Sequence, residues 1–512
     1  MKITRLERSK NTKRNMIVGE IDRITGILLP FFVRTMIIHM IGAEYLGLTS
    51  LFYSIVQMLN LTEMGFGTAI VYSMYVPVAR NDREMVNSLL SFYSKVYRIV
   101  GTAVAAAGLL LMPFLPGLIR DETPDGIHIY GLYLIYLANA VAGYFIFPER
   151  KALLTAHQRD DLGGRIHIFT QLFMYAAQAV IVALSRNYYL YAAMLPAASV
   201  CYSLLCARQA KRKYPAYTGG GKIRAEQKRE IQKQVAGLTI RKAAVMSRNS
   251  VDSIFISAFL GLEAAAVYAN YYYIMDSIVM VLAVIRVSMA GGVGNSIAVE
   301  TKEKNLKDMG RIDFLFMWVS GWCAICLLCL YQPFMELWAG RTMVLPFSAA
   351  LLFALYFYVL KMSDIRTLYS ESAGVWWQAR YISVAEAGAN LLLNWLFVRS
   401  MGIIGILSAT LVSYFLFNFI GGAVVLFRTY FTEGGIRTYF LSHARYGAVT
   451  MAAAAVTYIA VSQVHWEGIP GLMAKALVCG ILPHGIFYGC YRRTKEMKES
   501  RPLIEALIRI RW

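Results

Sequence analysis

Long apolar segments separated by short polar stretches recur along almost the whole chain, from residue 15 to residue 491. A transmembrane helix needs about 20 predominantly apolar residues, and these segments approach or exceed that length. The pattern therefore predicts an all-α integral membrane protein with about fourteen transmembrane helices. We expect them at residues 15–41, 46–73, 85–114, 127–147, 166–185, 188–207, 237–260, 265–293, 311–332, 345–369, 380–398, 402–427, 440–462 and 468–491.

The polar stretches indicate how these helices are grouped. The largest stretch follows the sixth predicted helix, is rich in Lys and Arg and contains three consecutive glycines, so we interpret it as a linker between two bundles. The predicted parts are a basic cytoplasmic N-terminus at 1–14, an N-lobe at 15–207, the linker at 208–236, a C-lobe at 237–427, a helix pair at 440–491 and a basic amphipathic tail at 492–512.

The composition of the chain and the distribution of its charge are typical of a membrane protein and not of a nucleic-acid-binding protein. The chain is 57% hydrophobic and 16% charged, with a net charge of +20. Most loop Lys and Arg residues fall on one side of the membrane if the N-terminus is cytoplasmic, as the positive-inside rule requires. We therefore expect both termini in the cytoplasm, membrane lipids as partners of the basic loops, and no nucleic acid.

No motif indicates an enzyme or a bound cofactor. Cys323, Cys326 and Cys329 are regularly spaced, but they lie in an apolar segment without a nearby His or carboxylate, and we interpret them as small buried side chains. The sequence has no nucleotide-binding glycine loop followed by Lys, no H-E-x-x-H and no nucleophile elbow. We expect no metal, no cofactor and no catalytic residue.

A short internal repeat relates the two predicted lobes. Residues 42–44 (GAE) and 261–263 (GLE) occupy the same hairpin position after the first and the seventh helix. Six helices separate the two hairpins, so the lobes have the same orientation, as in transporters built from parallel repeats. Arg34 and Asp252 precede these hairpins by nearly the same number of residues, and thus lie at similar depth.

Arg34 is the charge that is hardest to explain by structure alone. It lies inside the first apolar segment, and a charge near the bilayer centre costs roughly 2.5–3.5 kcal/mol on insertion scales. The nearest cytoplasmic charge, Arg23, is roughly 16 Å away along a helix, which is a long reach for snorkelling. Burial against an acid is one interpretation; we favour a side chain that lines a water-filled cavity.

Other membrane-depth charges have functional and structural interpretations of similar weight. Arg248 and Asp252 are four residues apart and can form a neutral pair on one helix face. Glu63 is either a proton or cation site or a helix-to-helix hydrogen bond. Arg286 either faces a cavity or extends to the cytoplasmic surface.

Several segments resemble the Wzx-type polysaccharide flippases of the multidrug/oligosaccharidyl-lipid/polysaccharide exporter superfamily. The matching segments are RTMIIHMIGAEYLGLTSLF (34–52), LTEMGFGTAIVYSMYVPVARND (61–82), SFYSKVYRIVG (91–101), VDSIFISAFLGLEAAAVYANYYYI (251–274), GGVGNSIAVE (291–300) and QPFMELWAG (332–340). The chain departs from the usual pattern at Thr49 and near Ala269, and its last two helices match loosely.

The resemblance implies two six-helix lobes around a central cavity, with two additional C-terminal helices. It implies a flippase that moves a lipid-linked oligosaccharide, usually on undecaprenyl pyrophosphate, across the cytoplasmic membrane by alternating access. Arg34 would then bind the pyrophosphate, because a guanidinium offers paired donors to phosphate oxygens. From depth and charge we further expect Arg248 and Arg286 at the substrate, and Asp252 and Glu63 in coupling to cations.

Other functions remain open at this point. The same fold would suit a lipid II flippase or a cation-coupled multidrug exporter, since the cargo is not directly encoded. A membrane polysaccharide polymerase is disfavoured, because the longest predicted outside loop has only about 12 residues, too few for a large external catalytic loop. Polymerase and glycosyltransferases of the same pathway are the expected partners of a polysaccharide flippase.

Overall fold

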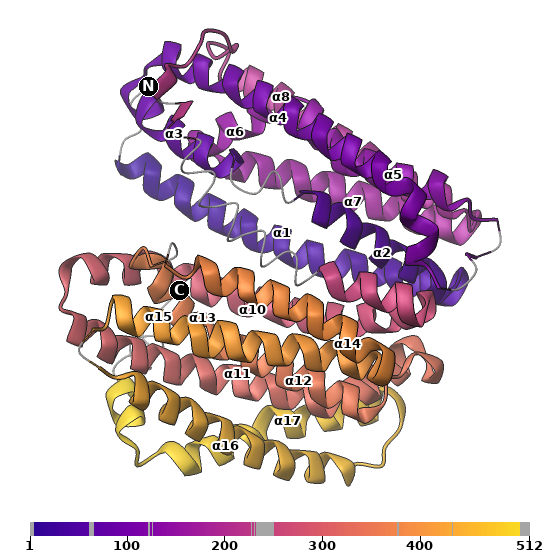
Figure 1. The fold of residues 1–512 in the computed structure, drawn as a ribbon, viewed down its shortest axis with the longest axis vertical. Coiled ribbons are helices and arrows are strands. Elements are labelled where there is room, and N and C mark those ends of the chain that lie inside the picture. The colour runs from indigo at the N-terminus through magenta and orange to yellow at the C-terminus, as the bar shows by residue number, and fades with distance from the viewer. Residues whose placement is uncertain are drawn as a thin grey trace. The chain divides into compact units, whose positions relative to one another are not determined.

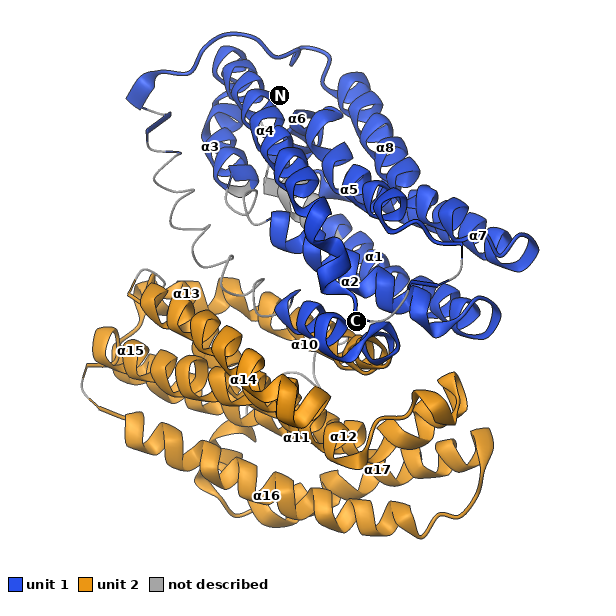
Figure 2. Cartoon of the chain, turned by 45° about the vertical axis from the view of Figure 1, so that its right-hand side comes forward, with its two compact units in different colours: residues 1–266 blue, residues 267–512 orange. Residues whose placement is uncertain are grey.

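The computed structural model describes residues 5–60, 66–120, 123–124, 126–226, 228–229, 231, 250–375, 378–432 and 434–501. Within these ranges the regular secondary structure is entirely helical. The helices form two compact units, residues 1–266 and residues 267–512 (Figures 1 and 2). Each unit is described by itself below.

The first unit contains the helices of the predicted N-lobe. They are α1 (Arg5–Met40), α2 (Ala43–Leu59), α3 (Phe66–Arg80), α4 (Arg83–Leu111), α5 (Ile129–Phe145), α6 (Pro148–Ala156), α7 (Asp160–Leu184) and α8 (Tyr188–Lys213), with a 3-10 segment η2 (Met112–Leu118) after α4. A further apolar helix, Ser250–Leu260, also belongs to this unit, although the sequence assigned it to the C-lobe. The two compact units are a different division of the chain from the predicted lobes, so the lobe boundaries stay a prediction.

Neighbouring helices of this unit pack in the order α1, α7, α8, α5, α4 and α3. Helix α4 shows how the sequence directs this packing. Its inward face carries apolar and aromatic residues three or four positions apart, such as Leu90, Tyr93 and Tyr97, all buried. Ile99 and Leu110 on the outward face are at least 70% exposed, as expected for side chains that meet lipid.

The fourth predicted span is bent. Helices α5 and α6 meet at an angle of 55°. Phe147 adopts a left-handed backbone conformation, with φ of +49°, and Pro148, which follows it, has no amide hydrogen to continue the helix. The helical backbone is therefore interrupted between α5 and α6.

The part of the linker that the structure describes is anchored to the first unit. Arg150 donates hydrogen bonds to the carbonyls of Tyr217 and Thr218, at 2.6 and 3.3 Å. The amide of Gly220 donates to the Ser91 hydroxyl at 2.7 Å. The first half of the linker thus lies against the N-terminal parts of α4 and α6.

The second unit contains the remaining helices. They are α10 (Leu262–Val299), α11 (Lys302–Ala339), α12 (Phe347–Met362), α13 (Asp364–Ser372), α14 (Arg380–Ser413), α15 (Gly422–Thr429), α16 (Ile436–Ser462) and α17 (Gly468–Tyr491), with a 3-10 turn η3 (Arg341–Met343) and a π-helix η4 (Tyr414–Gly421). Helix α10 begins within the last residues of the first unit. Helix α11 is central, because α12, α16 and α17 all pack against it.

Buried polar groups of the second unit are paired with one another. Lys361 is 1% exposed, and its ammonium lies 2.8 Å from a carboxylate oxygen of Asp364. His443 on α16 lies 3.0 Å from the buried carboxylate of Asp313 on α11. A buried charge without a partner is strongly unfavourable, so these pairs make apolar surroundings tolerable.

The predicted fold class is confirmed. Among the described residues, nine helices are long and apolar enough to cross a membrane, and the bent pair α5–α6 provides a further candidate. The run from Arg380 to Thr429 covers two predicted spans, and Gly402, with φ of +57°, lies between them. The amphipathic tail predicted for 492–512 lies mostly outside the described residues, which end at 501.

The close contact between α4 and α5 gives a test of this packing. A Cβ at Gly101 would lie 2.6 Å from Cβ of Tyr144, so Gly101→Ala forces the two helices apart. We expect a loss of roughly 1–3 kcal/mol of stability, measured as a lower Tm in detergent. Gly26→Ala on α1 is the control, because nothing lies within 4 Å of its Cβ. Equal Tm values for both variants would contradict the packing.

Candidate functional site

Arg34, the first predicted site residue, lies near the C-terminal end of α1, which spans Arg5–Met40. Its neighbours Val33 and Ile37 are fully buried, whereas Arg34 itself is half-buried. The guanidinium lies close enough to the Tyr191 phenol of α8 for a charge interaction. Arg34 therefore stands at the boundary between the packed interior of the lobe and more open space.

A group of tyrosines surrounds this part of the lobe. The rings of Tyr188 and Tyr191 stack with centroids 5.1 Å apart, and the Tyr45 ring lies 4.8 Å from that of Tyr188. Thr49, the position at which the sequence departs from the flippase pattern, is hydrogen-bonded to the hydroxyls of Tyr136 and Tyr188. Thr49 thus has a structural role in a buried hydroxyl network.

The other predicted residues are only partly described. Asp252 is 4% exposed and lies in the helix Ser250–Leu260, whose Ser253 accepts a hydrogen bond from Ser50 of α2 at 3.2 Å. Arg286 on α10 lies 3.4 Å from Glu371 on α13, and both are about 28% exposed. Glu63 and Arg248 lie outside the described residues. The site assignments therefore stay predictions.

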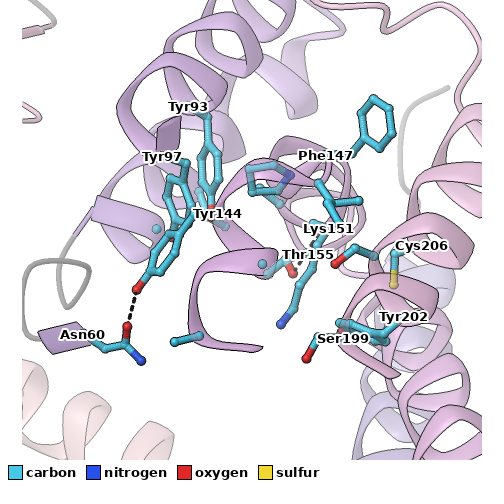
Figure 3. A pocket seen from close by; sticks show the side chains of 18 of the residues that line it. Asn60, Tyr93, Tyr97, Tyr144, Phe147, Lys151, Thr155, Ser199, Tyr202 and Cys206 are labelled. Atoms are coloured by element: carbon cyan, nitrogen blue, oxygen red, sulfur yellow. Dashed lines mark hydrogen bonds between the residues drawn. The ribbon is translucent and has the colours of Figure 1, made fainter. Parts of the chain in front are cut away.

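The first unit also contains a large pocket, which we call the N-lobe pocket. Its volume is about 730 Å³, in the range of small-molecule sites. Helices α3, α4, α5, α6 and α8 form its walls (Figure 3). Its lining consists of Asn60, Gly67, Val71, Tyr72, Tyr75, Tyr93, Tyr97, Asn139, Ala140, Gly143, Tyr144, Ile146, Phe147, Pro148, Lys151, Ala152, Thr155, Ser199, Tyr202, Ser203 and Cys206.

The helix bend explains where this pocket lies. Gly143, Phe147 and Pro148, at the junction of α5 and α6, are all lining residues. Since α6 turns away from the axis of α5, the two neighbours of the pair, α4 and α8, are held apart at that level. The pocket thus accommodates the irregular backbone that a membrane interior would otherwise exclude.

The N-lobe pocket is aromatic and polar, and it carries one charge. Tyr93 and Tyr97 stack with ring centroids 4.2 Å apart and an interplanar angle of 13°. Of the described lining residues, Lys151 alone is charged, and its ammonium lies 5.4 Å from the ring centroid of Tyr202. Figure 3 shows the Lys151 side chain reaching into the space between Tyr144 and Ser199.

Acids near Lys151 have other partners. A smaller hollow of about 300 Å³ shares Lys151 and includes Asp22 and Asp160. The Asp160 carboxylate accepts a hydrogen bond from Thr155 at 2.6 Å, and Asp22 lies 2.7 Å from His167. Within the part of the chain that the structure describes, Lys151 forms no ion pair.

Sequence reasoning did not single out this pocket. It placed the fourth span at 127–147 and left Lys151 in the following loop, whereas α6 continues the span. The signal was present as F-P-E-R-K at 147–151, where Pro breaks a helix before a basic residue. The lining tyrosines of α3 are 50 or more residues away in the sequence from the lining tyrosine of α5. Only the folded structure brings them to the same pocket.

The fold agrees with known membrane transporters. No family model matches the chain, and no curated protein matches its sequence. The lipid II flippase MurJ, in an inward closed conformation, superposes with a TM-score of 0.67 over 93% of this chain and 98% of its own, at 12% identity.

Transporters of the MATE family have a similar fold. An inward-facing multidrug resistance transporter of the MOP superfamily gives a TM-score of 0.58 at 14% identity, over 79% of this chain and 97% of its own. The transporter VcmN of Vibrio cholerae gives 0.54 at 16% identity, over 85% and 99%. The chain is therefore a multi-pass membrane protein with the fold of these transporters.

The openness of the N-lobe pocket can be measured by cysteine labelling. In a background without the seven natural cysteines, we expect Ser203→Cys to react with a small hydrophilic thiol reagent, because Ser203 lines the pocket. Ala192→Cys on the same helix is the control, since Ala192 is fully buried. Labelling is read by mass spectrometry on intact membranes. Equal reactivity at both positions would argue against a water-filled pocket.

Proposed function

We propose that this protein is a flippase that moves a lipid-linked oligosaccharide across the bacterial cytoplasmic membrane by alternating access, for capsule or cell-surface polysaccharide. The carrier would be undecaprenyl pyrophosphate. The observation that carries the proposal is a pocket of about 730 Å³ with a polar and aromatic lining, in a fold shared with a lipid II flippase. A hydrophilic head group needs such an environment, because an apolar interior would leave its hydroxyls without partners.

Charge in the pocket favours this cargo over a cationic drug. The described lining residues include one Lys and no Asp or Glu. A drug cation would be repelled by Lys151, whereas a neutral or acidic saccharide would be accepted. A multidrug exporter is therefore the second candidate, supported by the fold alone. A lipid II flippase differs from the main proposal only in the sugar and peptide on the carrier.

Arg34 is proposed to bind the pyrophosphate, with Arg248 and Arg286 adding positive charge. A guanidinium gives two parallel hydrogen bonds to phosphate oxygens, and a half-buried site strengthens the attraction relative to water. Asp252 and Glu63 are proposed to couple transport to cations. Polymerase and glycosyltransferases would make and use the cargo, and both termini would face the cytoplasm.

The role of Arg34 is tested by transport in proteoliposomes. Arg34→Ala should lower translocation of a fluorescent undecaprenyl-pyrophosphate-linked saccharide by about tenfold or more, since charge-assisted hydrogen bonds contribute about 1.5–3 kcal/mol. Arg34→Lys should keep part of the activity, because the charge remains but the paired donors are lost.

Arg23→Ala is the matched control, because Arg23 lies on the same helix, is exposed and pairs with the exposed Glu20. Unchanged transport by Arg34→Ala would overturn the role of this residue. Failure of the unmodified protein to move the labelled lipid, while it moves a cationic dye, would overturn the proposed function in favour of drug export.

Coupling is tested at Asp252. If its carboxylate takes up a proton or Na⁺ during the cycle, Asp252→Asn should remove the dependence of transport on an imposed pH or Na⁺ gradient. Asp313→Asn is the control, since Asp313 is also buried but pairs with His443 between α11 and α16. Gradient-dependent transport that survives in Asp252→Asn would show that this carboxylate is structural.

A further inference from the structure

We propose that the N-lobe pocket is a saccharide-binding site, in which an acidic substituent of the sugar, a carboxylate or a phosphate, pairs with Lys151. The proposal rests on the proposed function, because it takes the cargo to carry a saccharide. It assigns to the first unit a site for the head group that is distinct from the predicted phosphate contact at Arg34.

The hydrogen-bonding groups of the pocket are arranged to donate and accept around a polyhydroxyl ligand. The Asn60 side-chain oxygen accepts from the Tyr144 hydroxyl at 2.9 Å, and that of Asn139 accepts from Ser199 at 2.6 Å. Each amide oxygen is thereby engaged by the protein, which leaves the two NH₂ groups to donate to a ligand. Ser203 adds a hydroxyl, which can both donate and accept.

Aromatic rings provide the other half of sugar recognition. A pyranose ring presents a face of C–H groups, which packs against an aromatic face while its hydroxyls point outward to polar partners. Tyr72 and Tyr75, on successive turns of α3, are 65% and 39% exposed, and both line the pocket. Tyr202 lines the opposite wall, with Lys151 beside its ring.

Lys151 is the part of the pocket that selects for charge. Lys361 is buried and pairs with Asp364, whereas the Lys151 side chain is exposed. It extends into the pocket (Figure 3), while Asp160 and Asp22 beside it are engaged by Thr155 and His167. An acidic group on a bound sugar would form a charge-assisted hydrogen bond with this ammonium.

A lipid tail is a poor occupant of the same space. It would displace water from the amides of Asn60 and Asn139 and from the ammonium of Lys151 without offering them a hydrogen-bonding group in return. An anionic lipid head group carries a negative charge, as an acidic sugar does, but it has no sugar ring that can stack on a tyrosine. The experiment below therefore separates the saccharide from a phospholipid and from free phosphate.

Binding is measured on the full-length protein in phosphatidylcholine nanodiscs by saturation-transfer NMR titration. The probes are a glucuronic-acid-containing disaccharide, its neutral glucose counterpart, and inorganic phosphate. We expect the acidic disaccharide to bind about tenfold or more tightly than the neutral one, and inorganic phosphate to bind weakly because it lacks a stacking face.

Variants assign the binding to the pocket. Lys151→Gln should remove the preference for the acidic sugar and leave weak binding of both disaccharides, whereas Tyr75→Ala should weaken both. Lys95→Gln on α4 is the matched control, because Lys95 is exposed in the same lobe and does not line the pocket. Unchanged Tm values in all three variants would exclude misfolding as the cause.

Three results would overturn the proposal: no saccharide binding to the unmodified protein, an acidic-sugar preference that survives Lys151→Gln, or displacement of the sugar by added phosphatidylglycerol with Lys151-dependent binding of that lipid. The assay involves no transport, so its outcome is separate from the proposed function. Saccharide binding without translocation of the labelled lipid would overturn the flippase function alone, and the reverse result would overturn the pocket assignment alone.

Discussion

A bilayer interior offers no water to polar groups, and the structure of this chain follows from how each such group is satisfied. Helices satisfy their own backbone, and the regular secondary structure of the described ranges is entirely helical. Buried charges are paired in both units: Arg159 with Asp161 in the first, and Asp313 with His443 and Lys361 with Asp364 in the second. The first unit also contains the N-lobe pocket, which Phe147 and Pro148 line at the bend.

Paired charges and the N-lobe pocket have different consequences for a ligand. Where charges are paired and packed, the interior resists a polar ligand, because entry would require breaking a buried pair. Where Lys151 and two asparagine side chains line the pocket, a polar ligand finds groups with which it can form hydrogen bonds. A transporter for a hydrophilic head group needs both properties, a rigid apolar framework and one region that replaces water.

The likeness to known transporters has the same physical origin. A TM-score of 0.67 at 12% identity means that helix order and packing are shared while most side chains differ. Many apolar residues can exchange on a lipid-facing surface without changing the fold, since lipid tails are as apolar as the side chains. Cargo is therefore decided by the few polar groups that line cavities, and those have to be read from this chain itself.

The sequence by itself determined the helical class and the position of most spans. Runs of about 20 apolar residues leave few alternatives in a membrane, and Arg34 was evident because a charge there is costly. The sequence could not show that Lys151 enters a pocket, since the predicted span ends at 147 and α6 begins after the bend at Phe147.

Only tertiary structure brought Asn60, Asn139 and Lys151 together from three different helical regions, and it also gave Arg286 a partner in Glu371. The reason is physical: apolar periodicity is local, whereas the meeting of polar side chains depends on which helices pack and where one of them breaks.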